Sequence, residues 1–378
     1  MDSEELIGKI ASAHLGQRGG YKDSYDPGLL VRIPRRINRS LYAIDDNNPG
    51  FYGCDVWNCY EVSALTEKGL PVACMAKIIL PALSTYHVES KSLKLYLNSF
   101  NMTRMGKDRG ECLSLMEQKI ASDLSALLEC EVKVRLFTSA QVAKTLSENS
   151  LEGYKDILDF IPQSRLDAME FNDYSSNPGL IECITAPKAS FSVAKDDGCE
   201  TAVSAFSCHA GEISNANQTV IKFKSDLLRS NCRVTHQPDW GTVYVSMVCR
   251  DGCPVPTYES LLRYIVSHRS VFHFHEEICE MIYKHLLDIC EPQELMVACC
   301  YTRRGGIDIN PVRVSSRDLI PTEFSSPNIL LSKTYRQYFY IFLDVGDLSF
   351  RLLCQEKFAV SKILLTFVVQ YREVEQLV

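Results

Sequence analysis

The chain has 378 residues, and 40 Lys and Arg residues against 47 Asp and Glu residues give it a formal net charge of −7. Hydrophobic residues make up 46% and charged residues 23%, which is typical of a globular protein with a substantial core. The acidic balance argues against a general nucleic-acid coat or a basic membrane binder, because either needs a surplus of cations. No apolar run is long enough to cross a bilayer. The acidic N-terminus shows no secretory signal. We therefore expect a cytoplasmic protein.

The chain contains 16 cysteines, scattered through apolar stretches from Cys54 to Cys354. A large cytosolic chain keeps such thiols reduced, so we interpret most of them as small buried apolar residues. Cys249 and Cys253 are the only close pair that resembles half of a zinc site. No second pair at matching spacing accompanies it, and the sequence therefore predicts no metal site.

In the first half of the chain, a polar, turn-rich segment of about 50 residues precedes the first regular elements. Residues 72–80 are strand-like, and Pro81 ends the pattern. Residues 112–128 place apolar side chains on one helical face, which predicts an amphipathic helix. Residues 131–137 alternate apolar and charged side chains, as a half-buried strand does.

The second half repeats this plan after an irregular stretch at 186–217, which we interpret as a linker or insertion. The predicted elements are a strand at 242–248, helices at 258–266 and 276–289, and a strand at 295–301. The repetition predicts two related α+β units, at 1–185 and 218–325. Residues 326–378 form an apolar, aromatic extension. It either docks on the body or has no role in the chemistry, and we favour the second interpretation.

Cys232 and Asp239 lie seven residues apart in a proline-containing turn. A nucleophilic cysteine needs a partner that takes its proton and returns one later. Asp239 would suit that role if burial raised its pKa, and Trp240 offers an apolar wall beside it. On spacing alone, a buried structural cysteine near a turn-forming aspartate is the more common arrangement.

Glu89 stands where a strand runs into a helix, so it is either a helix-capping carboxylate or a group that binds the N–H donors of a purine-like edge. Arg303 and Arg304 precede two glycines, which suits either phosphate binding or a solvated turn. His275 opens a segment one residue short of a zinc-protease helix, because Cys279 stands where the second histidine belongs. No G-x-G-x-x-G follows a strand, which argues against a Rossmann unit.

Four motifs occur together and in order: E-S-K-S-L-K-L-Y from Glu89, N-C-R-V-T-H-Q-P-D-W from Asn231, F-H-E from Phe274 and T-R-R-G-G-I-D-I-N-P from Thr302. With them the chain resembles the NADPH-dependent 7-cyano-7-deazaguanine reductase family in its long, two-unit form. The resemblance runs from about residue 21 to 324 and thins at 186–217. It implies the α+β tunnelling fold, in which tandem units combine antiparallel sheets with paired helices. It also implies the reduction of a nitrile to a primary amine, on the pathway to the modified tRNA base queuosine.

The resemblance also assigns roles to residues of this chain. Cys232 adds to the nitrile carbon and forms a covalent thioimide, and Asp239 donates the proton to the nitrile nitrogen. The implied ligands are a small-molecule deazaguanine and NADPH, and the implied assembly is a homodimer that binds neither nucleic acid nor membrane. The residues implied for the deazaguanine are Val88, Glu89, Ser90, His275 and Glu276, and those for NADPH are Ser90, Lys91, Arg304 and Gly305.

Three other functions stay open at this point. A zinc-dependent GTP cyclohydrolase-like enzyme on the same fold needs a Cys/His metal set that the sequence does not assemble. A nitrilase-like hydrolase would also use Cys232 but would release an acid. A non-catalytic purine-binding protein would result if the extension blocked the site. The departures at 186–217 and after Phe324 bear on assembly more than on chemistry.

Overall fold

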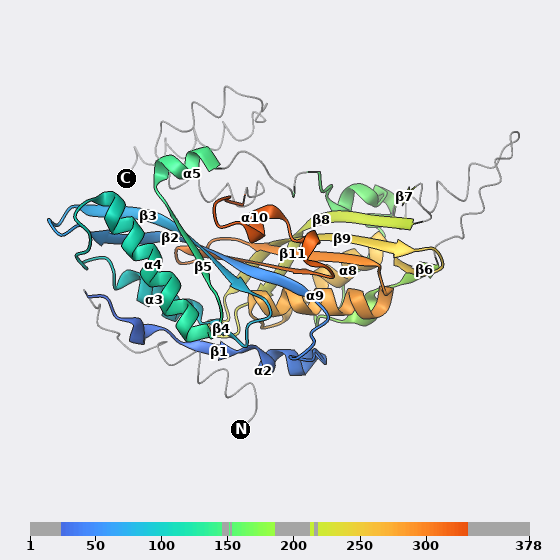
Figure 1. Ribbon diagram of the computed structural model, residues 1–378. Coiled ribbons are helices and arrows are strands. Elements are labelled where there is room, and N and C mark those ends of the chain that lie inside the picture. Colours follow the sequence, from blue (N-terminus) through green and yellow to red (C-terminus); the bar gives the residue numbers. More distant parts are fainter. Residues whose placement is uncertain (1–23, 146–150, 152, 186–211, 215–217, 332–378) are drawn as a thin grey trace, which may run out of the picture. The chain divides into compact units, whose positions relative to one another are not determined.

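The computed structural model describes residues 24–145, 151, 153–185, 212–214 and 218–331 (Figure 1). These residues belong to one compact unit that ends at Ser332. The predicted linker lies outside the described residues except for 212–214, and so does the extension from residue 332 onward. The extension begins within the described residues, where Leu330 and Leu331 are buried. The interpretation that the extension has no role in the chemistry stays a prediction, as does the division of the chain at 186–217.

The centre of the fold is an eight-stranded antiparallel sheet. Its strands, in spatial order, are β5 (Lys133–Phe137), β3 (Pro71–Pro81), β2 (Tyr52–Leu65), β12 (Ile307–Val314), β11 (Glu294–Tyr301), β9 (Pro238–Arg250), β8 (Gln218–Asn231) and β7 (Glu212–Ser214). Two short ribbons pair β1 (Arg32–Pro34) with β4 (Tyr86–Val88) and β6 (Cys183–Thr185) with β10 (Pro254–Pro256). Strands from both halves of the sequence thus meet where β2 pairs with β12.

The longer helices are α3 (Ser90–Asn98), α4 (Arg109–Leu128), α8 (Tyr258–Ser267) and α9 (His275–Cys290). Shorter ones are α2 (Arg35–Arg39), α5 (Ser139–Thr145), α6 (Gln163–Leu166) and α10 (Thr322–Ser325). The predicted elements are confirmed in type and order. Helix α4 begins three residues before its predicted start, because the Asp108 carboxylate caps it by accepting from the Glu111 backbone N–H at 3.0 Å. The α+β class with antiparallel sheets and paired helices is confirmed.

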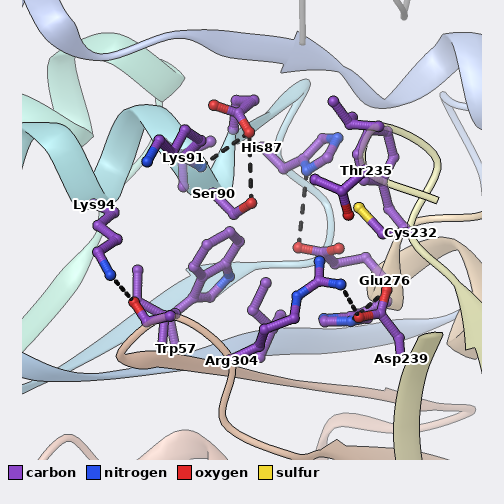
Figure 2. Close-up of a pocket in the computed structure, with 18 of the residues that line it drawn as sticks. Trp57, His87, Ser90, Lys91, Lys94, Cys232, Thr235, Asp239, Glu276 and Arg304 are labelled. Carbon is purple, nitrogen blue, oxygen red and sulfur yellow. Dashed lines mark hydrogen bonds and ion pairs between the residues drawn. The ribbon is translucent and has the colours of Figure 1, made fainter. Parts of the chain in front are cut away.

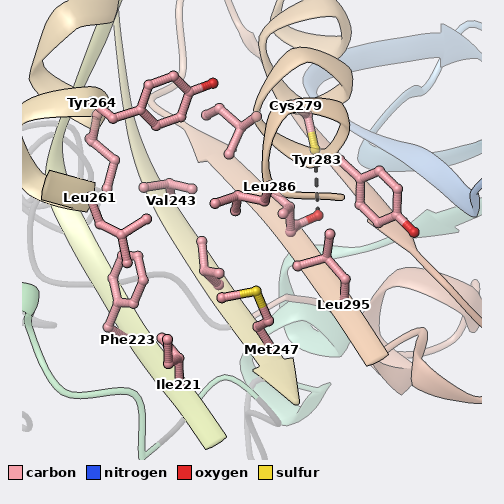
Figure 3. Close-up of a cluster of buried hydrophobic side chains, with 14 of the residues drawn as sticks. Ile221, Phe223, Val243, Met247, Leu261, Tyr264, Cys279, Tyr283, Leu286 and Leu295 are labelled. Atoms are coloured by element: carbon pink, nitrogen blue, oxygen red, sulfur yellow. Dashed lines mark hydrogen bonds between the residues drawn. The ribbon is translucent and has the colours of Figure 1, made fainter. Parts of the chain in front are cut away.

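Alternation along the strands places the four long helices on one face of the sheet. Trp57 of β2 pairs with Ile309 of β12, and both belong to the cluster formed with α3 and α4. Arg313 lies on the same face of β12 as Ile309 and pairs with Val297 of β11. Val297 belongs to the cluster formed with α8 and α9, so both clusters lie on the same face of the sheet. Figure 3 shows this second cluster, in which side chains of β8, β9 and β11 pack against the two helices.

A buried ion network connects the two halves beneath the helices. The Arg313 guanidinium bridges Asp55 at 2.8 Å and Glu280 at 2.8 Å, and Arg35 reaches the second Asp55 oxygen at 2.5 Å. Arg39 binds Glu280 at 2.9 Å. Removing one member would leave the others charged and unpaired in the interior. The free energy of unfolding would then fall by far more than the intact network contributes to it. The network thereby fixes β2, β12, α2 and α9, the elements around the site.

Candidate active site

One cavity of ≈ 220 Å³ opens on the helix-bearing face, where the two halves of the chain meet (Figure 2). It collects every residue to which the resemblance assigns a role, whereas Arg303, which pairs with Glu61 at 3.1 Å, and Trp240 do not line it. Lining it are Val88, Glu89, Ser90, Lys91, Cys232, Asp239, His275, Glu276, Arg304 and Gly305. Segments far apart in the sequence therefore form one site, although the role of each residue is still a prediction.

Four structural elements build the cavity. The N-termini of α3 and α9 bring Ser90 and His275 to it from opposite halves of the chain. The β8–β9 turn carries Cys232, and the β11–β12 turn carries Arg304. Both helices present backbone N–H groups at these ends, and their dipoles favour electron-rich ligand atoms there.

Cys232 lies half-buried at the start of a closed turn. Its backbone N–H donates to the Gln237 carbonyl at 2.8 Å, and the His236 N–H donates back to the Cys232 carbonyl at 2.9 Å. His236 closes the turn with φ of 56°, in the left-handed region. Because its backbone is fixed in this way, the Cys232 thiol has a defined position at the wall of the cavity.

Asp239 lies at the base of the same turn and is 6% exposed. Its carboxylate contacts Arg304 Nη1 at 2.9 Å and His275 Nε2 at 3.3 Å. Burial acts to raise the pKa of Asp239, but the charges and hydrogen bond of His275 and Arg304 outweigh it, so the pKa is lowered. The condition that burial leaves Asp239 with a raised pKa is therefore not met. The ionised carboxylate is suited to take a proton first and return it afterwards.

Glu89 is the N-cap of α3. Its Oε1 accepts from the Lys91 N–H at 2.9 Å, and its Oε2 accepts from the Ser92 N–H at 2.6 Å. The capping interpretation is confirmed by these bonds. Ser90 Oγ also donates to Oε1, at 3.5 Å, and Glu89 lines the cavity as well as capping the helix.

Glu276 is buried at the N-terminus of α9, and its Oε1 has no hydrogen-bond partner among the described residues. His87 Nδ1 lies 3.8 Å away, beyond hydrogen-bond length, and is also without a partner there. Burial and the charge of Asp55 raise the pKa of Glu276 to about 7, although the charges of His275 and Arg35 act to lower it. Burial and the charge of Arg35 lower the pKa of His87 to about 3, so this imidazole is neutral at physiological pH.

We predict that the protein loses stability as the pH rises, because the buried Glu276 carboxyl group loses its proton. Its folded pKa lies above the model-compound value of 4.5, so the folded state binds more protons than the unfolded state between about pH 4.5 and 7. The free energy of unfolding therefore falls across this interval. In urea titrations at pH 8, Glu276→Gln should be more stable than the wild type by roughly 1–3 kcal/mol, the cost of an unsatisfied buried polar group. At pH 4.5 the difference should vanish.

Glu277→Gln is the matched control for this prediction, because Glu277 follows Glu276 in α9 and is also buried, but its carboxylate is paired. Its carboxylate contacts Arg233 at 3.0 Å and His273 at 2.9 Å. Loss of that charge should destabilise the protein at pH 8. Equal destabilisation of both variants would show that Glu276 is paired in the folded protein.

The opposite end of the cavity carries cations. Lys91 is exposed at the first turn of α3, and the Lys94 ammonium donates to the Gly305 carbonyl. Arg304 is 37% exposed at the side chain while it pairs with Asp239. Gly305 has φ of 60°, a conformation that suits glycine. These donors fit a dinucleotide that carries phosphate groups, and the Arg304 ion pair links this end of the cavity to Asp239.

The part of the chain that the structure describes contains no group of three or more His, Cys, Asp or Glu side chains placed to hold a metal ion. Within the same residues, no helix is both long and apolar enough to span a membrane.

Two other residues of the cavity, Trp57 and His87, carried no signal in the sequence. Trp57 forms part of its wall with Ile307 and Ile309, which belong to the motif from Thr302, and His87 lies in the wall with Phe274 of the F-H-E motif. An apolar residue on a strand looks like core in a sequence, and only the sheet register shows that these side chains meet a cavity. Trp57 and His87 each have a buried ring nitrogen without a hydrogen-bond partner among the described residues. That property can be seen only in the folded structure and not in the sequence.

Comparison with known proteins identifies the family of the chain. The family profile described as "Nitrile reductase, 7-cyano-7-deazaguanine-reductase N-term" matches residues 21–136, and the profile described as "QueF-like protein" matches residues 238–318. Two relatives, from Cupriavidus taiwanensis and Cupriavidus metallidurans, are named NADPH-dependent 7-cyano-7-deazaguanine reductase. Each is 37% identical over 302 residues, which cover 80% of this chain and 92% of the relative.

Among solved structures, the apo form of the archaeosine synthase QueF-Like is 18% identical to this chain, with a TM-score of 0.23. The match covers 27% of this chain and 95% of that one. The two profiles and the near full-length relatives establish the family: this chain belongs to the NADPH-dependent 7-cyano-7-deazaguanine reductases.

Proposed function

We propose that this protein reduces the nitrile of 7-cyano-7-deazaguanine to the primary amine of 7-aminomethyl-7-deazaguanine, with NADPH as reductant, in queuosine biosynthesis. The observation that carries the proposal is a single cavity that holds a half-buried thiol, an ionised buried carboxylate and an unpartnered carboxylate oxygen. The first two suit nitrile addition. The third suits recognition of the base.

In the proposed first step, the sulfur of Cys232 forms a bond to the nitrile carbon. Asp239 accepts the thiol proton and then delivers it to the nitrile nitrogen, so that one C–S bond and one N–H bond form while one S–H bond and one C–N π bond are lost. No net proton leaves the site. The lowered pKa keeps Asp239 ionised and so leaves its carboxylate a place for the proton, and the cations that lower this pKa, Arg304 and His275, line the same cavity.

The carboxylates hold the base. A deazaguanine presents adjacent N–H and NH2 donors along one edge, which an ionised carboxylate accepts as a pair. Glu276 offers an oxygen that has no partner among the described residues, and Glu89 lines the same cavity. Val88, Ser90 and His275 complete the proposed binding surface. Ionisation of Glu276 strengthens the contact, so affinity for the base should rise as the pH increases through about 7.

NADPH, when bound, supplies the two successive hydrides that a nitrile needs to become an amine. Ser90, Lys91, Arg304 and Gly305 are proposed to hold it, since their cations and exposed backbone suit phosphate groups. The covalent bond to Cys232 would keep the substrate in place through the first transfer. Cleavage of the C–S bond would then restore the thiol and leave an imine, which the second transfer would convert to the amine.

We also propose a cytoplasmic homodimer. The described cysteines are free thiols, which suits a reducing compartment. The outermost strands β5 and β7 present sheet edges on which a second copy could add its own strands. The proposed substrate is a small molecule, and no direct contact with nucleic acid is required.

Product mass and NADPH stoichiometry test this function. We expect two NADPH molecules to be oxidised per nitrile consumed and an amine to be the only product. Formation of the acid without NADPH oxidation would establish a nitrilase-like hydrolase instead. Binding of the base with neither product would establish a purine-binding protein.

Glu89→Ala is predicted to weaken base binding by roughly 1.5–3 kcal/mol, the range for a hydrogen bond to a charged group. Calorimetry with the base measures this effect. Asp108→Ala is the matched control, because Asp108 caps α4 in the same manner outside the cavity. Both variants should lose helix-cap stability, but only Glu89→Ala should lose affinity. Normal base affinity with weakened NADPH binding would show that the ligand assignments are reversed.

A further inference from the structure

Trp57 has an unexplained hydrogen-bond donor in the wall of the cavity. The side chain is 1% exposed, and its Nε1 is buried without a partner among the described residues. An indole N–H can only donate, whatever the pH or tautomer. Leaving such a donor unsatisfied in the interior costs stability, and native structures rarely retain one without a reason.

The position of Trp57 is fixed by the sheet and not by its own polar contacts. It pairs with Ile309 of β12 and Ile78 of β3 at the centre of the eight strands. Figure 2 shows the indole turned into the cavity, in the region bounded by Ser90, Lys94 and Arg304. A ligand that enters the cavity is therefore able to supply the acceptor that the folded chain does not.

The chemistry of the cavity identifies the kind of acceptor. Its carboxylates, Glu89 and Glu276, can only accept hydrogen bonds when ionised, so they cannot bind a carbonyl oxygen of the ligand. Beside the indole, Ile307 and Ile309 provide an apolar wall against which an aromatic ring can pack. A carbonyl oxygen on a planar heterocycle fits both this wall and the unused N–H donor.

We infer that Trp57 is a ligand-binding residue whose Nε1–H donates to an amide-type carbonyl oxygen of a bound heteroaromatic ring. The inference rests on the proposed function, which supplies two such groups. One is the ring carbonyl of the deazaguanine, and the other is the carboxamide of nicotinamide. Both present the same acceptor chemistry, and the two arms of the experiment distinguish them.

The test compares two proteins that both carry Cys232→Ala, so that no covalent bond to the base can form. One retains Trp57, and the other also carries Trp57→Phe. Calorimetry measures the Kd of 7-cyano-7-deazaguanine, and nucleotide fluorescence measures the Kd of NADPH. Loss of one hydrogen bond should raise one of these constants roughly 5- to 10-fold. A rise for the base assigns its ring carbonyl as the partner, and a rise for NADPH assigns the carboxamide.

Val62→Ala is the matched control, because Val62 is buried on the same strand in the same apolar cluster but does not line the cavity. It should lower the unfolding midpoint and leave both constants unchanged. If Trp57→Phe behaves in the same way, with both constants within twofold of the background, Trp57 is only a core residue and the inference is overturned. If the background protein binds neither ligand, the proposed function fails first.

A measurement on the unsubstituted indole guards against a Trp57→Phe protein that does not fold. In the Cys232→Ala background, a base analogue with an amino group in place of the ring carbonyl should bind more weakly, and so should a thioamide analogue of NADPH in the nicotinamide arm. Full affinity for both analogues would overturn the inference.

Discussion

The Cys232→Ala protein is expected to lose all NADPH oxidation that depends on 7-cyano-7-deazaguanine. The methyl group cannot form the bond to the nitrile carbon, and the β8–β9 turn contains no second thiol. Steady-state assays at saturating NADPH measure this directly. Binding of the base should persist, because the residues proposed to hold it belong to α3, α9 and β4.

Cys253→Ala serves as the control, since Cys253 is also a half-buried thiol in a turn but does not line the cavity. It should retain wild-type turnover. Substantial activity in Cys232→Ala would remove the covalent mechanism, whereas loss of activity in both variants would indicate a general effect of cysteine replacement.

Asp239→Asn is expected to slow thioimide formation by about 10²–10⁴-fold, the usual contribution of a general acid–base group. The amide preserves size and burial but cannot take the thiol proton or return it to nitrogen. It also removes the ion pairs with Arg304 and His275. Single-turnover mass spectrometry follows adduct formation, and calorimetry should show that base affinity is largely kept.

Asp308→Asn is the control for a buried aspartate outside the cavity, because its carboxylate accepts from Asn58 and Tyr60 on the neighbouring strand. That variant should lose stability and keep its rate of adduct formation. An unchanged rate in Asp239→Asn would assign proton transfer to another group.

Pattern and composition predict those elements of the fold whose two faces differ. Helix α4 has one apolar face, and β5 alternates along its length, so both were predictable. Strand β2 was not predicted, because six consecutive residues from Cys54 to Cys59 are buried and carry no alternation. Asp55 and Asn58 lie within that run, and only the partners Arg35, Arg313 and Asp308 explain polar side chains there.

The family resemblance likewise identified the residues of the site but not their electrostatics. The spacing of the turn from Asn231 to Trp240 by itself favoured a structural cysteine, and only the resemblance gave Cys232 and Asp239 roles in the chemistry. The pKa of Asp239 depends on His275 and Arg304, which come from later segments and reverse the effect of burial. Trp57 and His87 were missed because their importance lies in hydrogen bonds that the fold leaves unmade.

The covalent role of Cys232 is tested most directly by the intact mass of the wild-type protein after mixing with 7-cyano-7-deazaguanine in the absence of NADPH. Without a hydride source the reaction should stop at the thioimide. We predict a mass increase equal to one molecule of the base per chain, located by peptide mapping at Cys232 and lost when NADPH is added. An unchanged mass while the base is bound, or an adduct on a different cysteine, would contradict this mechanism.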